Sequence, residues 1–433
     1  MSKPRSVEAV TEALKEDAND GTVIIDYKGQ KGRAAHERKL LKKDAAPLPV
    51  SEGVVAKLAT LQRGILSETR FSAGNIQPTR LQVTGTSGND NVVEFVYATG
   101  RQVFETHAPL GLSADEQERV TLGTQGANIS NIVQMKAPTS RPLVAEEVLH
   151  KAEIQSLAHK GPLVASVDAR GVAVLYTASS GAVNMDDIHD NDEESCGESS
   201  RKKLKAADCR ATGHVLSGDG GTPELGWAGI AFNPVSNQVF TKAVRFYDSH
   251  TLQTTHVQTS LLMPTALAYS SSSTLVVAEY NQRIAREGLP SLGCVHAVAW
   301  SLDGNSVAIG GEDKIAYIYD TRKWKLRSLW RCPLKYELAY LAFSPTDPTL
   351  CYVAGLDNEL MVGTFDGAEK KKQAAKEHSP SILQMNHHLG FRGDSRWIGV
   401  DVIRDGSGGH DLAVGVCESG SVYAIQPAQH MLG

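Results

Sequence analysis

The stretch VHAVAWSLDGNSVAIGGEDKIAYIYD, residues 295–320, carries the clearest structural pattern of the chain. Short apolar runs alternate there with turn signals, of which Asp303-Gly304 is the strongest, because Asp-Gly favours a tight hairpin turn. The predicted strands are Val295–Trp300, Ser306–Ile309 and Ile315–Tyr319, with Lys323–Leu329 as a candidate fourth. The stretch therefore predicts one small antiparallel sheet.

A four-position pattern inside this stretch (aliphatic, Ala, aromatic, then Ser or Asn) occurs four times in the chain. Its alanines are Ala231, Ala268, Ala299 and Ala342, which lie 37, 31 and 43 residues apart. Self-similarity at periods of about 20–50 residues is typical of stacked repeat units. A sheet of four short strands cannot bury both faces alone, so neighbouring sheets must pack against it.

The order strand, Ser-x-Asp-Gly turn, strand, Gly-Gly-x-Asp turn and strand ending in Tyr-Asp resembles the WD40 repeat over roughly residues 225–366. The resemblance implies a β-propeller, usually of seven blades. No blade begins with a clear Gly-His, and Tyr247-Asp248 and Tyr319-Asp320 replace the usual Trp-Asp. The buried His–Asp network of many WD40 blades is therefore not expected. An unrelated all-β domain with similar turns is the alternative.

The expected fold class is all-β: a seven-bladed WD40-like β-propeller with a mostly irregular, partly helical N-terminal arm. The arm is residues 1–50, which are basic, and the propeller is residues 51–430. Polar, charged inserts at about 181–210 and 368–380 are expected to be disordered, because they offer little apolar surface to bury. Val54–Leu66 is the candidate strand that completes the last blade and closes the ring.

Composition and charge narrow the function class. A net charge of −5 over 433 residues argues against direct nucleic-acid binding. The six cysteines include no Cys-x-x-Cys pair, so zinc-finger spacing is absent and a reducing compartment is expected. Neither a signal peptide nor a membrane-spanning segment is expected. The expected location is the nucleus, the cytoplasm or both.

No catalytic motif emerges from the sequence. Gly-x-Ser-x-Gly and His-Glu-x-x-His are both absent. The adjacent pair His387-His388 would point to opposite faces of a strand and could not chelate one ion well. No catalytic, cofactor-binding or metal-binding residue is predicted, and the protein is not expected to be an enzyme or to take a small-molecule substrate.

The leading functional hypothesis is a protein-interaction scaffold within a multi-protein complex. The alternative comes from Tyr319-Asp320-Thr321-Arg322, which resembles the Trp-Asp-x-Arg motif by which some WD40 proteins dock on the adaptor of cullin-RING ubiquitin ligases. On that reading the protein is a substrate receptor, and Tyr319, Asp320 and Arg322 bind the partner. A reader of modified peptides is a third hypothesis.

Two charged segments suggest regulation. Arg201, Lys202, Lys203 and Lys205 resemble a minimal import signal, and residues 28–43 are also strongly basic. Ser195, with Glu198 three residues on, resembles an acidophilic-kinase phosphosite. The alternatives are a tolerated surface insertion for the first segment and the phosphosite, and a solvated helix for residues 28–43.

Overall fold

The structure is a computed structural model. It describes residues 60–70, 77–87, 91–110, 132–144, 149–178, 211–216, 229–235, 238–241, 245–249, 251–257, 264–270, 275–279, 283–284, 294–332, 334–364, 383–384, 386–387, 390–406 and 409–426. The expected arm at 1–50 and the two expected inserts lie outside these ranges. Within them, no helix has the length and hydropathy needed to cross a membrane.

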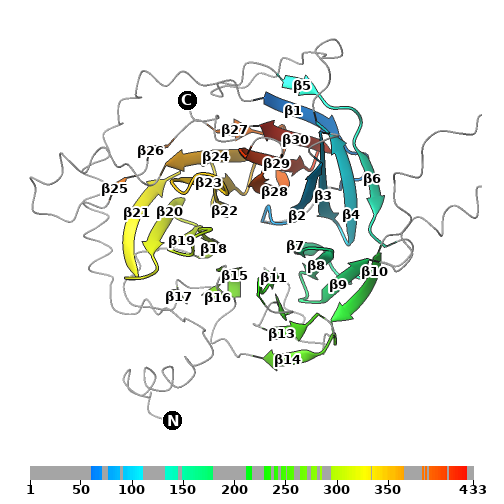
Figure 1. Ribbon diagram of the computed structural model, residues 1–433, viewed down its shortest axis with the longest axis horizontal. Helices are drawn as coiled ribbons and strands as arrows, with labels where there is room; N and C mark the ends of the chain where they lie inside the picture. The colour runs from blue at the N-terminus through cyan, green and yellow to red at the C-terminus, as the bar shows by residue number, and fades with distance from the viewer. Residues whose placement is uncertain are drawn as a thin grey trace, which may run out of the picture.

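The strands in the described part of the chain form seven separate sheets around a common centre (Figure 1). The first three sheets are β2 (Leu81–Ser87), β3 (Val92–Thr99), β4 (Gln102–Pro109) and β6 (Thr139–Pro142); β7 (Ile154–Lys160), β8 (Leu163–Asp168), β9 (Ala173–Ala178) and β10 (Ala211–Leu216); and β11 (Ala231–Phe232), β12 (Gln238–Thr241), β13 (Arg245–Asp248) and β14 (Thr254–Val257).

The next three sheets are β15 (Pro264–Tyr269), β16 (Leu275–Glu279) and β17 (Arg283–Ile284); β18 (Val295–Trp300), β19 (Ser306–Gly311), β20 (Ile315–Asp320), β21 (Lys325–Arg331) and β25 (Leu383–Gln384); and β22 (Leu338–Phe343), β23 (Leu350–Gly355), β24 (Glu359–Thr364) and β26 (Asn386–His387), with β27 (Phe391–Arg392) also on β24. The last sheet joins β28 (Trp397–Arg404), β29 (Asp411–Cys417), β30 (Ser421–Gln426), β1 (Thr60–Ile65) and β5 (Ile132–Gln134).

The first strands of these sheets contact one another in an unbroken cyclic order. That order is β2, β7, β11, β15, β18, β22, β28 and back to β2. Successive strands within each sheet pair antiparallel, as the turn signals of the repeat predict. The described chain is therefore all-β, and its arrangement is compatible with a WD40 propeller.

Strand β1 closes this circle. It pairs antiparallel with β30, with Leu61 opposite Ile425 and Arg63 opposite Tyr423, so the N-terminal strand completes a sheet built from the C-terminal strands. The prediction that Val54–Leu66 supplies the closing strand is confirmed for residues 60–65; residues 54–59 lie outside the described ranges. Closure removes a sheet edge that would otherwise expose unpaired backbone groups.

The core lies between neighbouring sheets. One cluster joins Tyr352 and Val362 of the β22–β26 sheet to Trp397 and Tyr423 of the next sheet, and Leu61 of β1 belongs to the same cluster. Five further clusters each join two neighbouring sheets; among the described residues, the β11–β14 and β15–β17 sheets share no such cluster. Because each sheet buries its faces against two others, its stability depends on them.

Two outer edges carry an added parallel strand. The segment after β4 places β5 beside β1, the outer strand of the preceding sheet. The segment after β24 likewise places β25 beside β21, again on the preceding sheet. These additions cover edges that could otherwise pair with other chains. The sequence did not predict either pairing.

One sheet contains a His–Asp network that the sequence analysis did not expect. His150 lies with Nε2 2.5 Å from Ser166 Oγ and with Nδ1 3.5 Å from Asp168 Oδ2. Asp168 also accepts hydrogen bonds from the backbone N–H groups of Ala152 and Val172. Burial alone would raise the pKa of Asp168, but the interaction with His150 and the backbone hydrogen bonds hold it below its usual value. The sequence analysis expected no such network because no blade begins with Gly-His. That expectation was wrong for this sheet, in which Leu149 precedes the histidine.

Cys294, Cys351 and Cys417, which lie beside or within strands, are buried and free. Cys332 is also buried and free. Burial raises the pKa of each of these four thiols. They are therefore protonated at neutral pH.

Replacing Leu61 with alanine tests the role of β1. Leu61 is fully buried in the core cluster, so Leu61→Ala should lower the free energy of unfolding by about 2–5 kcal/mol. Ile65 lies on the same strand but is 60% exposed, and Ile65→Ala should change that free energy by less than about 0.5 kcal/mol. Denaturant unfolding of both variants makes the comparison; equal losses would contradict the packing of β1 against the last sheet.

Candidate functional site at the inner rim

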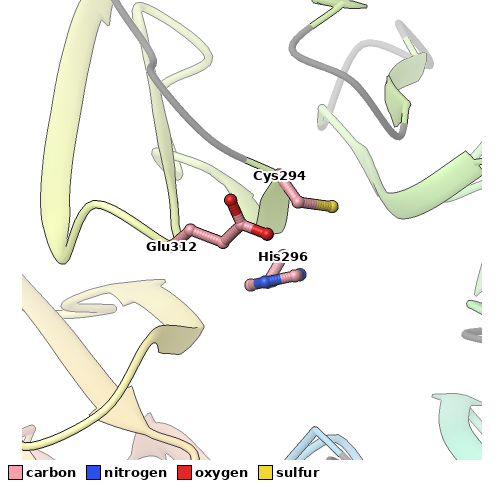
Figure 2. Close-up of side chains that lie close together, drawn as sticks. All are labelled: Cys294, His296 and Glu312. Carbon is pink, nitrogen blue, oxygen red and sulfur yellow. The ribbon is translucent and has the colours of Figure 1, made fainter.

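Three side chains with metal-binding or acid–base chemistry gather at the start of β18. Cys294 directly precedes the strand, His296 is its second residue, and Glu312 directly follows β19. Figure 2 shows the three side chains close together, and their candidate ligand atoms all lie within 4.8 Å of one another.

A glycine and a strand irregularity bring Glu312 to this position. The pairing of β18 with β19 shifts register between Val295 and Ala297. A Cβ atom at Gly311 would collide with the carbonyl group of Cys294, so only glycine fits this close approach. The backbone N–H of Glu312 then donates to the carbonyl oxygen of Cys294 at 3.1 Å.

Two further segments reach the same place, which we call the inner rim: residues 294–296, Glu312, Glu337 and Gln77. Glu337 directly precedes β22, and its Oε2 lies 3.3 Å from Nε2 of His296. Gln77 precedes β2 on another part of the circle, and its side-chain N–H donates to the carbonyl oxygen of His296 at 2.8 Å. The inner rim therefore joins three different sheets around one histidine.

Burial sets the protonation states at the inner rim. Burial lowers the pKa of His296 to about 4, although the charge of Glu312 opposes this shift. Burial also raises the pKa of Cys294 to about 12, and the charge of Glu312 adds to the increase. At neutral pH the site holds a neutral imidazole and a neutral thiol.

The two carboxylates of the site raise its local negative charge. Burial raises the pKa of Glu337, the charge of Glu312 raises it further, and Lys314 opposes both effects. A neutral thiol is a poor nucleophile, so this arrangement does not favour covalent catalysis by Cys294. The site instead offers possible metal ligands: one sulfur, one nitrogen and nearby carboxylate oxygens, which together could hold a metal ion.

The residues predicted from the Tyr-Asp-x-Arg motif lie at the other end of the same sheet. Tyr319 is buried and packs in the core cluster between the β15–β17 and β18–β21 sheets. Arg322 is exposed, and its Nη2 lies 2.9 Å from Oδ2 of Asp320. Hydrogen bonding from Arg322 lowers the pKa of Asp320 to about 2. The structure therefore pairs Asp320 with Arg322 at the surface but separates both from the inner rim.

The other predicted residues lie outside the described ranges. These are the import-signal residues Arg201, Lys202, Lys203 and Lys205, and the phosphosite Ser195. The sequence analysis did not predict the inner rim. The available signal was Cys294-x-His296 at the start of a predicted strand, but the contributions of Glu312, Glu337 and Gln77 depend on tertiary structure.

No protein-family model matches the chain, and no curated protein matches it. Among solved structures, a chain of "Crystal Structure of Mitotic Checkpoint Complex" aligns with a TM-score of 0.47 and 13% sequence identity, covering 88% of this chain and 96% of that chain.

The protonation of His296 predicts a pH dependence of stability. Its pKa is about 4 in the folded protein and about 6.5 in an unfolded chain. The unfolded state therefore binds the proton more readily, so this histidine's contribution is fully present above pH about 6.5 and is lost as pH falls towards 4. Across that interval, wild-type protein should lose up to about 3 kcal/mol more stability than His296→Gln.

Urea unfolding of both proteins at several pH values, in buffer with a chelator, measures this difference. If the free energies of unfolding of the two proteins differed by the same amount from pH 7 to pH 4, His296 would be protonated as easily in the folded state as in the unfolded one.

Proposed function

We propose that the protein is a non-catalytic, seven-bladed WD40-type β-propeller that serves as an interaction platform for other proteins within a multi-protein assembly. Each of the seven sheets would be one blade. The cyclic contact of the first strands supports this proposal, because such a ring leaves the loops at both ends of the blades available for partners. Location in the nucleus, the cytoplasm or both is part of the proposal; the basic segments support the nucleus, and the cysteine spacing supports a reducing compartment.

The observation that carries the platform role is a pair of exposed apolar side chains on structured turns. Val235 is 74% exposed in the connection after β11, and Leu302 is 73% exposed in the connection after β18. Both connections join the first strand of a sheet to the second, so both leave their sheets at the same face of the ring.

Internal hydrogen bonds hold these turns in place. The backbone N–H of Val235 donates to Oδ1 of Asn233 at 2.9 Å. In the other turn, Ser301 Oγ donates to Oδ1 of Asp303 at 2.6 Å, and the N–H of Asn305 donates to the same oxygen. A preorganised apolar side chain loses less conformational entropy on binding than a mobile one, which favours partner recognition at this face.

Substituting both apolar residues tests the platform. The double variant Val235→Asp with Leu302→Asp should reduce recovery of the main partners in affinity purification by more than about 10-fold, since central contacts are often worth at least about 2 kcal/mol. Tyr336→Ser is the matched control, because Tyr336 is exposed at the opposite face, in the connection before β22. Equal recovery with the double variant and wild type would remove the proposed face.

The second candidate function is a substrate receptor of a cullin-RING ubiquitin ligase. The exposed guanidinium of Arg322, held by Asp320 on the turn after β20, favours this reading. This turn lies at the same face as Leu302, since it connects the third strand of the sheet to the fourth. The buried ring of Tyr319 would support the turn from below without touching the partner.

Arg322→Ala tests this candidate. The substitution removes the charged contact, so co-purification of the ligase adaptor should be abolished. Lys323→Ala, at the next exposed position of the turn, is the control and should leave recovery unchanged. Adaptor recovery that is the same for Arg322→Ala and wild type would eliminate the receptor role and leave the platform proposal standing.

A further inference from the structure

We propose that Cys294, His296 and Glu312 form a binding site for a divalent transition-metal ion, with Zn²⁺ as the preferred ion. Their ligand atoms lie within 4.8 Å of one another. In a tetrahedral zinc site, bond lengths of about 2.0–2.3 Å place ligand atoms about 3.3–3.8 Å apart. The most distant ligand atoms therefore need to approach one another by only about 1–1.5 Å to bind one ion.

The donor set selects the kind of metal. One thiol sulfur, one imidazole nitrogen and one carboxylate oxygen match the ligands that Zn²⁺ accepts. Calcium and magnesium prefer sites made of oxygen atoms, so a sulfur–nitrogen–oxygen set disfavours them. Cys294 binds as the thiolate, and its proton passes to solvent when the metal enters.

Two of the three ligands are held rigidly. Cys294 and His296 are 5% and 4% exposed at the start of β18, and the backbone of His296 is fixed further by the hydrogen bond from Gln77. Glu312 is exposed, so its side chain can rotate to close the site without disturbing the core. Its backbone is tied to Cys294, which keeps the carboxylate within reach.

Glu337 gives the histidine a carboxylate neighbour of the kind found in metal sites. Its Oε2 lies 3.3 Å from Nε2 of His296. Carboxylates next to a metal-bound imidazole orient the ring and increase its basicity. The negative charge of Glu312 also repels the carboxylate of Glu337 in the unloaded site. A bound cation would relieve that repulsion.

The placement of the site gives the metal a structural consequence. The three ligands come from one sheet, whereas Glu337 precedes the first strand of the next sheet and Gln77 the first strand of a third. An ion that also takes Glu337 as a ligand would therefore link two neighbouring sheets at the inner rim. Three protein ligands also leave a fourth position, which water, Glu337 or a partner's side chain can fill.

Metal binding to the full chain tests the proposal. The protein, stripped with a chelator, is titrated with Zn²⁺ in competition with a chromophoric chelator, and separately with Co²⁺, whose spectrum reports tetrahedral geometry and thiolate bonding. We expect one tightly bound zinc ion per chain and a thiolate-to-cobalt charge-transfer band. Because the chain has 14 histidines and six cysteines, the assignment depends on variants.

Cys294→Ala should abolish the charge-transfer band and weaken zinc binding by more than about 100-fold, because even outer-shell partners are worth about 10–100-fold. Glu312→Gln should weaken binding comparably, and its exposed position keeps the result interpretable if Cys294→Ala fails to fold. Glu337→Gln should weaken binding by about 10–100-fold as an orienting residue. A loss as large as that of Glu312→Gln would make Glu337 the fourth ligand.

Cys332→Ala is the matched control. Cys332 is also buried, at 6% exposed, but it packs in a hydrophobic core cluster and is not one of the three proposed ligands. It should bind zinc as wild type does. The proposal fails if wild-type protein shows no thiolate-to-cobalt band, or if Cys294→Ala and Glu312→Gln both bind zinc with wild-type affinity.

Discussion

Strand β1 lies beside β30, which brings Leu61 next to Ile425 and joins the N-terminal strand to the C-terminal sheet. The rest of the structure depends on this pairing. Each sheet buries its faces against its two neighbours, so an open row of sheets would leave one face exposed at each end. Pairing β1 with β30 ties the two ends of the row together, and buried clusters then cover both faces of the closing sheet.

The same constraint explains the outer edges. Strands β1 and β21 would expose backbone hydrogen-bonding groups at the periphery, but β5 and β25 pair with them in parallel. Both added strands come from the connection between the third and fourth strands of the following sheet. Long connections at this corner can therefore protect an edge while leaving the first three strands of their own sheet unchanged.

Regular features of the fold could be predicted from the sequence because they depend on local patterns. Apolar runs bounded by Asp-Gly and Gly-Gly turns predicted the strands around Trp300 and Tyr319, and an apolar N-terminal run predicted the closing strand. The two parallel additions could not be predicted, because β5 and β25 are three and two residues long and have no measurable alternation.

The sites depend on contacts that local patterns do not encode. His150 meets Ser166 and Asp168 only after β7 and β8 have paired. The inner rim requires the register shift after Val295 and the close approach allowed by Gly311. By contrast, Asp320 and Arg322 are two residues apart on one turn, so their pairing follows from the turn itself. These differences explain why the motif was visible in the sequence and the inner rim was not.

Both the partner-binding face that carries Val235 and Leu302 and the proposed metal site at the inner rim are built from several sheets. Both proposals therefore depend on closure of the ring. A cysteine cross-link measures closure most directly. Ile65 lies opposite Ser421 in the pairing of β1 with β30, and directly opposed Cα atoms are about 4.5–5.5 Å apart, within disulfide range. The pair Ile65→Cys with Ser421→Cys should form a disulfide detectable by mass spectrometry of linked peptides.

The pair Ile65→Cys with Ile425→Cys is four residues out of register, about 13 Å apart along the strand, and should not cross-link. Single-cysteine variants give the background from the native thiols. A disulfide in the first pair alone is the result that closure predicts. No cross-link in the first pair, or equal cross-linking in both, would contradict a ring closed through β1 and β30.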